Sequence, residues 1–226
     1  LRLANLFDDD MVLQRGASIP VWGKAVSNTP VTVSMSTGES TSTTSDANGD
    51  WSATLPSMPA STHGAVTMTI TSGSRTMQVT NLLVGDVWFC SGQSNMDWIL
   101  ENTDGSAAEI ASANYPDLRY AGTPETSDTS PWTELNARAN WQVCHPDVAA
   151  DFSAVAYYFG KYVHLDQNIP IGLIKSAQGG TTIEKWAINL TAPGTDTFYN
   201  SRVHPYTRMP IKGAIWYQAE ANIADG

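Results

Sequence analysis

The sequence predicts an α/β protein in which an N-terminal β-sandwich domain precedes a domain built on a parallel sheet. The first third of the chain consists of short segments rich in Val, Ile, Thr and Trp, separated by Gly, Pro, Asn, Asp and Ser, a pattern typical of antiparallel strands. After about residue 81, strand-like runs alternate with stretches of helical length, as in parallel sheets with crossover helices. We therefore expect a sandwich domain over residues 1–80 and a second domain over residues 81–226.

The N-terminal segment contains four clear strand candidates, namely SIPVWGKA, TPVTVSMS, GDWSATLP and AVTMTITSG. Their residues partly alternate between apolar and polar types, as expected for strands with one buried face. The Asn48-Gly49 pair in DANGDW predicts a tight hairpin. Because this segment gathers no catalytic side chains, we expect it to pack against the second domain or to contact a ligand beside it.

The second segment contains three buried-looking strands, within LLVGDVWFCSG, IPIGLIKSAQGG and IKGAIWYQAEAN. Each ends in polar or glycine-rich sequence. Ligands of open parallel sheets bind beyond the carboxyl ends of the strands, so we expect these three ends to converge on one crevice. Between the strands, residues 151–166 are predicted to form an amphipathic helix capped by Asp151 or Ser153, with its apolar face made of Val155, Tyr158, Phe159 and Tyr162.

Composition excludes two classes of partner. A formal net charge of −10 and a pI near 4.6 leave no basic face for phosphate contacts, so we expect no nucleic-acid partner. No apolar run approaches the roughly 20 residues that span a bilayer, so we expect no membrane partner either. The low charged fraction, 15%, favours an exported protein, whether periplasmic, extracellular or lysosomal. Cys90 and Cys144 either pair in an oxidising compartment or remain buried thiols.

Ser94 is the candidate nucleophile. It lies in Gly92-Gln93-Ser94-Asn95-Met96, directly after the first strand of the second segment, and lacks the second glycine of a Gly-x-Ser-x-Gly elbow. A serine in such a turn is more often an N-cap than a nucleophile. A strand end that opens a helix also presents backbone N–H groups, however, and these stabilise a developing oxyanion. This position therefore favours the nucleophile.

Four further residues are candidates for the same site. Gly179 and Gly180 follow the second strand, where they serve either a turn with positive φ or the approach of substrate to a free N–H. Gln218 and Asn222 follow the third strand, and their side-chain amides can donate to a carbonyl oxygen. Glu220, between them, is expected to be a structural acceptor rather than a general base.

Three segments together resemble a known family. GQSNM, SAQGGTTIEKW and WYQAEAN occur in the order and spacing of the sialate O-acetylesterases and related carbohydrate acetylesterases of the SGNH hydrolase superfamily. LFDDDMVLQRGASIPVWGKA, FSAVAYYFGKYV and YNSRVHP are also similar to that family, so the resemblance covers essentially the whole chain. It implies a β-sandwich domain followed by the first part of a flavodoxin-like SGNH hydrolase domain.

The resemblance implies a serine esterase that removes O-acetyl groups from carbohydrate, either sialic acid or a plant polysaccharide such as xylan, without cofactor or metal. Ser94 corresponds to the nucleophile. Its own N–H, that of Gly180 or Gly179, and the amide of Gln218 or Asn222 would form the oxyanion hole. Supporting roles fall to Glu220 and Asn95.

The chain departs from the family pattern in two places. Ala219 and Ala221 stand where Gly and Ser are usual, and Ala219 would obstruct a positive φ. The Asp-x-x-His motif that supplies the general base and its carboxylate is absent, because no Asp stands three residues before any histidine, namely His63, His145, His164 and His204. We therefore expect a C-terminal part of the same precursor to carry this motif and complete the sheet. It is either cleaved after Gly226 and still docked, or separated from it by a disordered break.

The rival hypotheses are a carbohydrate-binding protein on a hydrolase fold that has no turnover, and an inactive fragment. The absence of a base favours the binding protein, and some of the eight Trp residues could stack on sugars. Trp22, Trp88 and Trp216 lie in predicted strands, however, and are expected in the core. A lipid or thioester hydrolase would need an apolar channel that the sequence does not reveal. An acidic sugar would favour an arginine in the pocket, but we expect Arg138, Arg202 and Arg208 at the surface.

Overall fold

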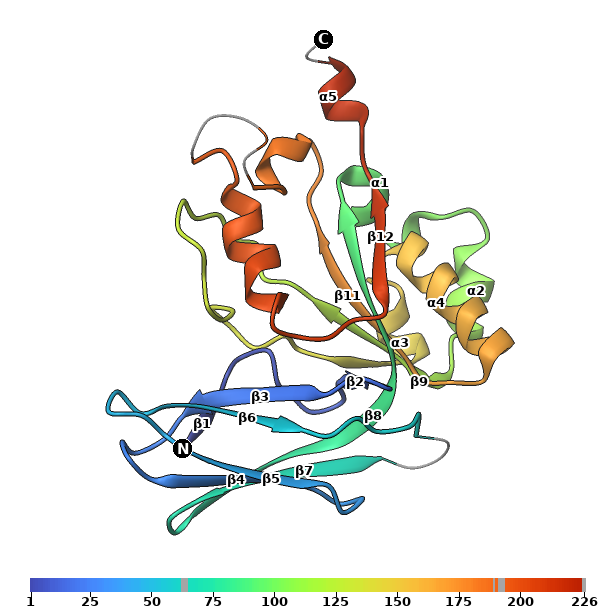
Figure 1. Cartoon of the computed structure of the whole chain (residues 1–226). Coiled ribbons are helices and arrows are strands. Elements are labelled where there is room, and N and C mark those ends of the chain that lie inside the picture. Colours follow the sequence, from blue (N-terminus) through green and yellow to red (C-terminus); the bar gives the residue numbers. More distant parts are fainter. Residues whose placement is uncertain (62–64, 189, 191–193, 225–226) are drawn as a thin grey trace.

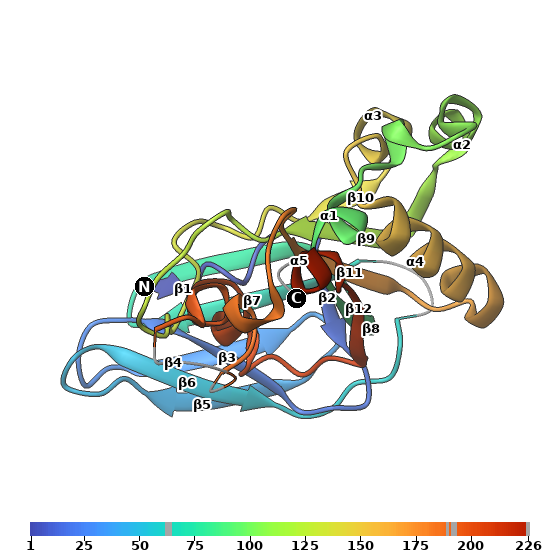
Figure 2. The same cartoon turned by 90° about the horizontal axis from the view of Figure 1, so that it is seen from above.

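The computed structural model describes residues 1–61, 65–188, 190 and 194–224. Its strands form a large mixed sheet of nine strands and a second sheet of three (Figure 1). Helices accompany the mixed sheet along the second part of the chain. Figure 2 shows α2, α3 and α4 grouped at one side of the molecule, away from β3, β4, β5 and β6. The prediction of a mixed α/β fold is confirmed.

The first part of the chain forms two facing layers of antiparallel strands. The smaller layer has the order β1-β3-β6, and the other continues from β5 through β4 and β7 into β8. Residues of β6 alternate between buried and exposed, and those of β7 between buried and half-buried, because successive side chains of a strand point to opposite faces. The strands are β1 (Arg2–Leu3), β3 (Ile19–Lys24), β4 (Pro30–Met35), β5 (Ser40–Thr44), β6 (Asp50–Leu55) and β7 (Val66–Ser72).

The Asn48-Gly49 turn does not form the predicted hairpin. The strands on either side of it, β5 and β6, pair with β4 and β3 respectively and belong to different sheets. The Asp46 carboxylate accepts from the backbone N–H groups of Asn48, at 2.8 Å, and Asp50, at 2.9 Å. The turn is therefore tight, as the Asn-Gly pair indicates, but it carries the chain from one layer to the other.

One long strand, β8 (Arg75–Gly92), joins the two parts of the molecule. Its first half pairs antiparallel with β7, and its second half pairs in parallel with β11 (Ile171–Ala177) and β12 (Gly213–Tyr217). Between these halves, β2 (Val12–Gln14) pairs with residues 83–85. The expected boundary between residues 80 and 81 therefore lies inside a single strand.

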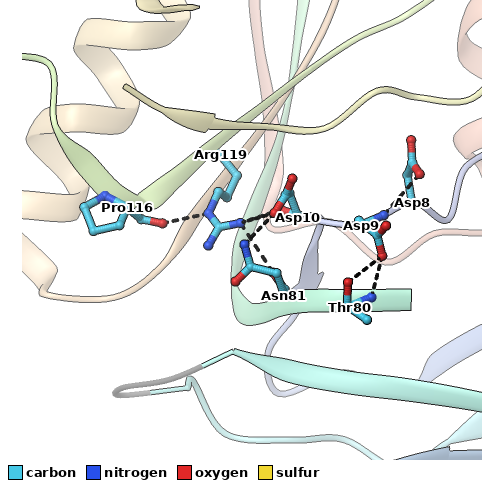
Figure 3. A network of polar contacts seen from close by, with 7 residues as sticks. All are labelled: Asp8, Asp9, Asp10, Thr80, Asn81, Pro116 and Arg119. Carbon is cyan, nitrogen blue, oxygen red and sulfur yellow. Dashed lines mark hydrogen bonds and ion pairs between the residues drawn. The ribbon is translucent and has the colours of Figure 1, made fainter. Parts of the chain in front are cut away.

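A buried arginine holds the bend in this strand (Figure 3). Arg119, on β9 (Tyr115–Gly122), is 3% exposed and donates to the carbonyls of Pro116 at 2.7 Å, Asp10 at 3.1 Å and Asn81 at 3.4 Å. Asp10 and Asn81 both have positive φ, 67° and 54°, and the Asn81 amide donates to the Asp10 carboxylate. Burial lowers the pKa of Arg119, while the charge of Asp10 opposes that shift.

A second polar cluster holds the start of the parallel half. Asp86 is 4% exposed, and its carboxylate accepts from Arg15 at 2.8 and 2.9 Å and from Gln14 at 3.1 Å. Burial alone would raise the pKa of Asp86, but the hydrogen bonds from Arg15 and Gln14 outweigh it, so the pKa lies below its ordinary value. The Asp86 carboxylate is therefore charged at neutral pH, and both of its oxygens accept hydrogen bonds.

The predicted helix is observed as α4 (Ala154–Gln167), with Ser153 as its N-cap. The predicted apolar face is wrong in part, because Tyr162 is 62% exposed and the fully buried side of the helix includes Ala156, Tyr157 and Gly160. A Cβ at Gly160 would lie 2.8 Å from side-chain atoms of Leu118 and Leu173. Small residues therefore let α4 approach the sheet closely.

The remaining elements are short. They are β10 (Gln142–Cys144), α1 (Ser94–Asp97), η1 (Leu100–Asn102), α2 (Ser106–Ser112), α3 (Pro146–Ala149), η2 (Ile183–Lys185), η3 (Tyr199–Val203), η4 (His204–Tyr206) and α5 (Glu220–Ala224).

Cysteine and tryptophan placement answers two open questions. Cys90 and Cys144 are buried free thiols, and burial raises the pKa of both, that of Cys144 to about 11. Trp22 is buried and Trp88 half-buried, but Trp216 is 42% exposed. The expectation of a core position for Trp216 is wrong, because β12 pairs only with β8 in the described part of the chain.

Candidate active site

Three strand ends meet at one edge of the mixed sheet. Gly92 of β8 is in register with Ala177 of β11 on one side and with Tyr217 of β12 on the other. The loops that follow these residues carry the three sequence segments expected to form a site. The carboxyl ends of parallel strands are where α/β folds bind ligands, so the topology brings these segments to a ligand-binding edge.

The turn at Gly92 requires glycine. Its φ is 139°, and a Cβ there would lie 2.0 Å from the carbonyl oxygen of Tyr217. Gln93 then donates its N–H to that same oxygen at 3.0 Å, which ties the turn to β12. Ser94 follows as the first residue of α1 and is exposed. Its hydroxyl bonds to no other residue in the described part of the chain, so the chain presents a free Oγ at the strand end.

Gly179 is the glycine closest to the serine. A Cβ at Gly179 would lie 3.5 Å from the Ser94 Cβ. Gly180 has a φ of 68° and has open space where its Cβ would be. The loop is held by the Gln178 N–H, which donates to the Gly92 carbonyl at 3.3 Å, and by the Thr181 hydroxyl, which donates to the Gln178 carbonyl at 2.8 Å. Gly179 thus borders the serine, while Gly180 makes the turn.

The two amide side chains of the third segment face different partners. Gln218 donates from Nε2 to the carbonyl of Thr181 at 2.7 Å, which places it against the glycine loop. Asn222 donates from Nδ2 to both carboxylate oxygens of Glu184, at 3.1 and 3.2 Å, and accepts from the Ile183 N–H at 3.0 Å. Gln218 therefore lies at the edge where the loops meet, whereas Asn222 is hydrogen-bonded to two residues of η2.

Glu220 and Asn95 join the first and third segments. The Asn95 amide donates to the Glu220 carboxylate, whose other oxygen accepts from the Ala219 N–H at 3.1 Å. The Ala221 N–H donates to the side chain of Gln93 at 3.2 Å. Ala219 is not among the residues with positive φ, so alanine is compatible with this loop.

None of the described histidines is hydrogen-bonded to Ser94. His204 Nδ1 bonds to the carbonyl of Trp132 at 2.8 Å, and His164 Nδ1 to that of Ile169 at 2.8 Å. His145 caps α3 by accepting from the Asp147 N–H. His63 lies outside the described residues. The described part of the chain therefore offers the serine no imidazole base.

Arg202 is a residue of this region that sequence reasoning misplaced. It is 3% exposed, and it donates to the Gln178 side chain at 2.6 Å and to the Thr126 carbonyl at 2.7 Å. Its guanidinium lies 4.4 Å from the centre of the Phe198 ring, and burial lowers its pKa. The expected surface position is wrong for Arg202, because loops distant in sequence fold over it, and no local pattern signals this.

Arg138 and Arg208 are exposed, as expected.

Two further findings concern metal binding and membrane-spanning helices among the described residues. They contain no group of three or more His, Cys, Asp or Glu side chains arranged to hold a metal ion. Among them, no helix has both the length and the apolar character needed to cross a membrane.

Comparison with known proteins assigns the chain to a family. Residues 84–225 match the profile of a family described as carbohydrate esterase, sialic acid-specific acetylesterase, and the chain belongs to this family. The family is one of carboxylic ester hydrolases, as the sequence predicts.

Individual relatives give the same result over a larger part of the chain. The sialate O-acetylesterases of Pongo abelii and Homo sapiens are 30% and 29% identical, over 98% of this chain and 49% of theirs. The crystal structure of a carbohydrate acetylesterase from Xanthomonas citri superimposes with a TM-score of 0.91 at 34% identity, over 98% of this chain and 52% of that one. The chain thus spans about half the length of these relatives.

Proposed function

We propose that this chain carries the nucleophile of a serine esterase that removes O-acetyl groups from carbohydrate. The observation that carries the proposal is the free Ser94 hydroxyl at the joint end of β8, β11 and β12, beside Gly179. The family's description and the printed names of the relatives support the substrate class.

In the proposed reaction, Ser94 Oγ forms a bond to the acetyl carbonyl carbon and gives its proton to a general base. The oxyanion is held by the N–H groups of Ser94 and of Gly179 or Gly180, with the Gln218 amide as third donor. Asn222 is a weaker choice, because its Nδ2 donates to both carboxylate oxygens of Glu184, whereas the Gln218 Nε2 donates only to the Thr181 carbonyl among the described residues. The sugar oxygen leaves with the proton, and water then releases acetate from Ser94.

The general base is proposed to come from a further segment of the precursor, which carries Asp-x-x-His. Two facts support this. The relatives are about twice as long as the part matched here, and β12 has an unpaired edge in the described chain, with Trp216 and Tyr217 42% and 47% exposed. Such an edge invites pairing with another strand. The added segment would complete a flavodoxin-like SGNH hydrolase domain beside a sandwich domain that ends near residue 80.

We propose that the substrate is an acetylated sialic acid or an acetylated plant polysaccharide such as xylan. We also propose that the enzyme is exported. The names of the mammalian relatives favour sialate. The name of the bacterial relative specifies only a carbohydrate. Comparing release of acetate from O-acetylated sialic acid and from acetylated xylan would separate the two substrates.

The test of the proposed function is Ser94→Ala in the precursor or in the complete two-chain assembly. We expect hydrolysis of p-nitrophenyl acetate to fall by at least about 10³-fold, because the nucleophile is removed, while far-UV circular dichroism stays unchanged. Ser112→Ala, on the exposed part of α2, is the control and should keep the full rate. If the unmodified assembly hydrolyses no faster than buffer, the esterase is excluded and the non-catalytic sugar-binding protein takes its place.

A further inference from the structure

A cavity lies between the three-stranded sheet and loops of the second part of the chain. Its volume is about 580 Å³, and residues of β1, β3 and β6 line it together with Thr133, Glu134 and Arg208. None of its lining residues belongs to the loops around Ser94. The cavity is therefore separate from the candidate active site.

Two of the cations in this cavity are neutralised. Arg2 donates to both oxygens of Glu134, at 2.7 and 2.8 Å, and Lys24 pairs with Asp50 at 2.6 Å. The two pairs themselves add no net charge to the cavity walls. They also hold two carboxylates in fixed positions, where each can accept a further hydrogen bond.

Arg208 is different, because no carboxylate pairs with it in the described part of the chain. Its guanidinium lies 4.2 Å from the centre of the Trp22 ring, and its Nη2 donates to the Ser52 hydroxyl at 3.0 Å. The side chain is exposed, so its remaining N–H groups face solvent. The chain has 22 acidic and 12 basic residues, so Arg208 provides a local positive charge in an otherwise acidic molecule.

The Arg208 guanidinium is held before any ligand arrives. Trp22 is 6% exposed, and Phe7 packs edge-on against it at 4.9 Å between ring centres. Stacking uses the flat face of the guanidinium and leaves its edge free, and that edge is the part that binds a carboxylate with two parallel hydrogen bonds. Less side-chain entropy is lost on binding when the group is already fixed.

We propose that this cavity binds a sugar acid, with Arg208 holding its carboxylate. The carboxylates of Asp50 and Glu134 and the hydroxyls of Thr44 and Thr133 can accept hydrogen bonds from sugar hydroxyls. The volume falls within the roughly 300–1,000 Å³ of small-molecule sites. The choice of a sugar rests on the proposed function. The anion site rests on Arg208 and the cavity.

The test is an NMR titration of the ¹⁵N-labelled chain with D-galacturonate, D-galactose and acetate, followed at the indole N–H signals of Trp22 and Trp51. We expect saturable shifts with galacturonate, and none with galactose or acetate at the same concentrations. Equal effects of galactose would overturn the role of the carboxylate. If acetate caused the same shifts, the sugar ring would have no role in binding. If no probe caused a shift, the proposed binding site would be wrong.

Arg208→Gln should weaken galacturonate binding at least tenfold, and Arg208→Lys should weaken it less. Arg75→Gln, which changes an exposed arginine outside the cavity, is the matched control and should bind as the unmodified chain does. Unchanged binding by Arg208→Gln with a folded spectrum would exclude Arg208 as the anion ligand. Ser94→Ala should bind galacturonate normally, because Ser94 is not among the residues that line the cavity. If the unmodified assembly is inactive on p-nitrophenyl acetate but still binds galacturonate, the esterase proposal fails and this one stands.

Discussion

At the scale of single residues, Gly92 shows how closely the serine turn is packed. Its φ of 139° and the 2.0 Å approach of the Tyr217 oxygen to a Cβ leave no room for a side chain. We expect Gly92→Ala to lower the free energy of unfolding by about 2–4 kcal/mol, since both strain and a backbone clash result. Urea unfolding followed by fluorescence would measure it.

Gly122→Ala is the control for this substitution. No atom lies within 4 Å of a Cβ at Gly122, and its φ is not positive. We expect a change of less than about 0.5 kcal/mol there. If the two substitutions cost the same, the geometry of the turn is not what requires glycine at position 92.

Asp86 gives a prediction about pH. Its pKa in the folded protein is lower than the unfolded value of about 3.9, so its charged form stabilises the fold above that pH and the contribution is lost as pH falls through the folded pKa. We expect Asp86→Asn to cost roughly 1–3 kcal/mol at pH 7, and less below about pH 4. Urea unfolding of both proteins at several pH values would test this, and a pH-independent difference would contradict it.

At the scale of secondary-structure elements, the packing of α4 depends on the small residue Gly160 rather than on the exposed Tyr162. A Cβ at Gly160 would lie 2.8 Å from the side chains of Leu118 and Leu173. We therefore expect Gly160→Val to lower the free energy of unfolding by about 1–3 kcal/mol through overpacking. Tyr162→Ala, on the exposed side of the same helix, should change it by less than about 1 kcal/mol. Thermal unfolding by circular dichroism would compare them, and a larger loss for Tyr162→Ala would restore the predicted apolar face.

At the scale of the whole molecule, Arg119 couples the sandwich strands to the parallel ones. It donates hydrogen bonds to Asp10, to Asn81 at the bend of β8 and to Pro116 of β9. We expect Arg119→Met to lower the free energy of unfolding by about 2–4 kcal/mol, because buried acceptors lose their donor. Urea unfolding would give the value.

Arg138→Met is the matched control. Arg138 forms an exposed ion pair with Asp8, which lies two residues before the Asp10 that Arg119 contacts. Exposed pairs contribute about 0–1 kcal/mol, so this change should be small. Equal losses for the two arginines would mean that burial of Arg119 adds nothing to its role at the joint.

The sequence by itself determined the features that depend on local patterns. The alternation of strands and helices, the N-cap at Ser153 and the polar ends of three strands were readable because each is encoded within a few neighbouring residues. The order of three short segments was enough to indicate the family. Their meeting at one edge followed from the rule for parallel sheets.

Only the tertiary structure decided which residues are buried and which hydrogen-bond partners they have. It placed Gly179 rather than Gly180 beside Ser94, turned Asn222 toward Glu184, and buried Arg202 behind the glycine loop. It also sent the Asn48-Gly49 turn between two sheets and left Trp216 exposed on β12. These outcomes arise from contacts between segments far apart in the chain. The free energy of such contacts depends on both segments, so no short stretch of sequence predicts it.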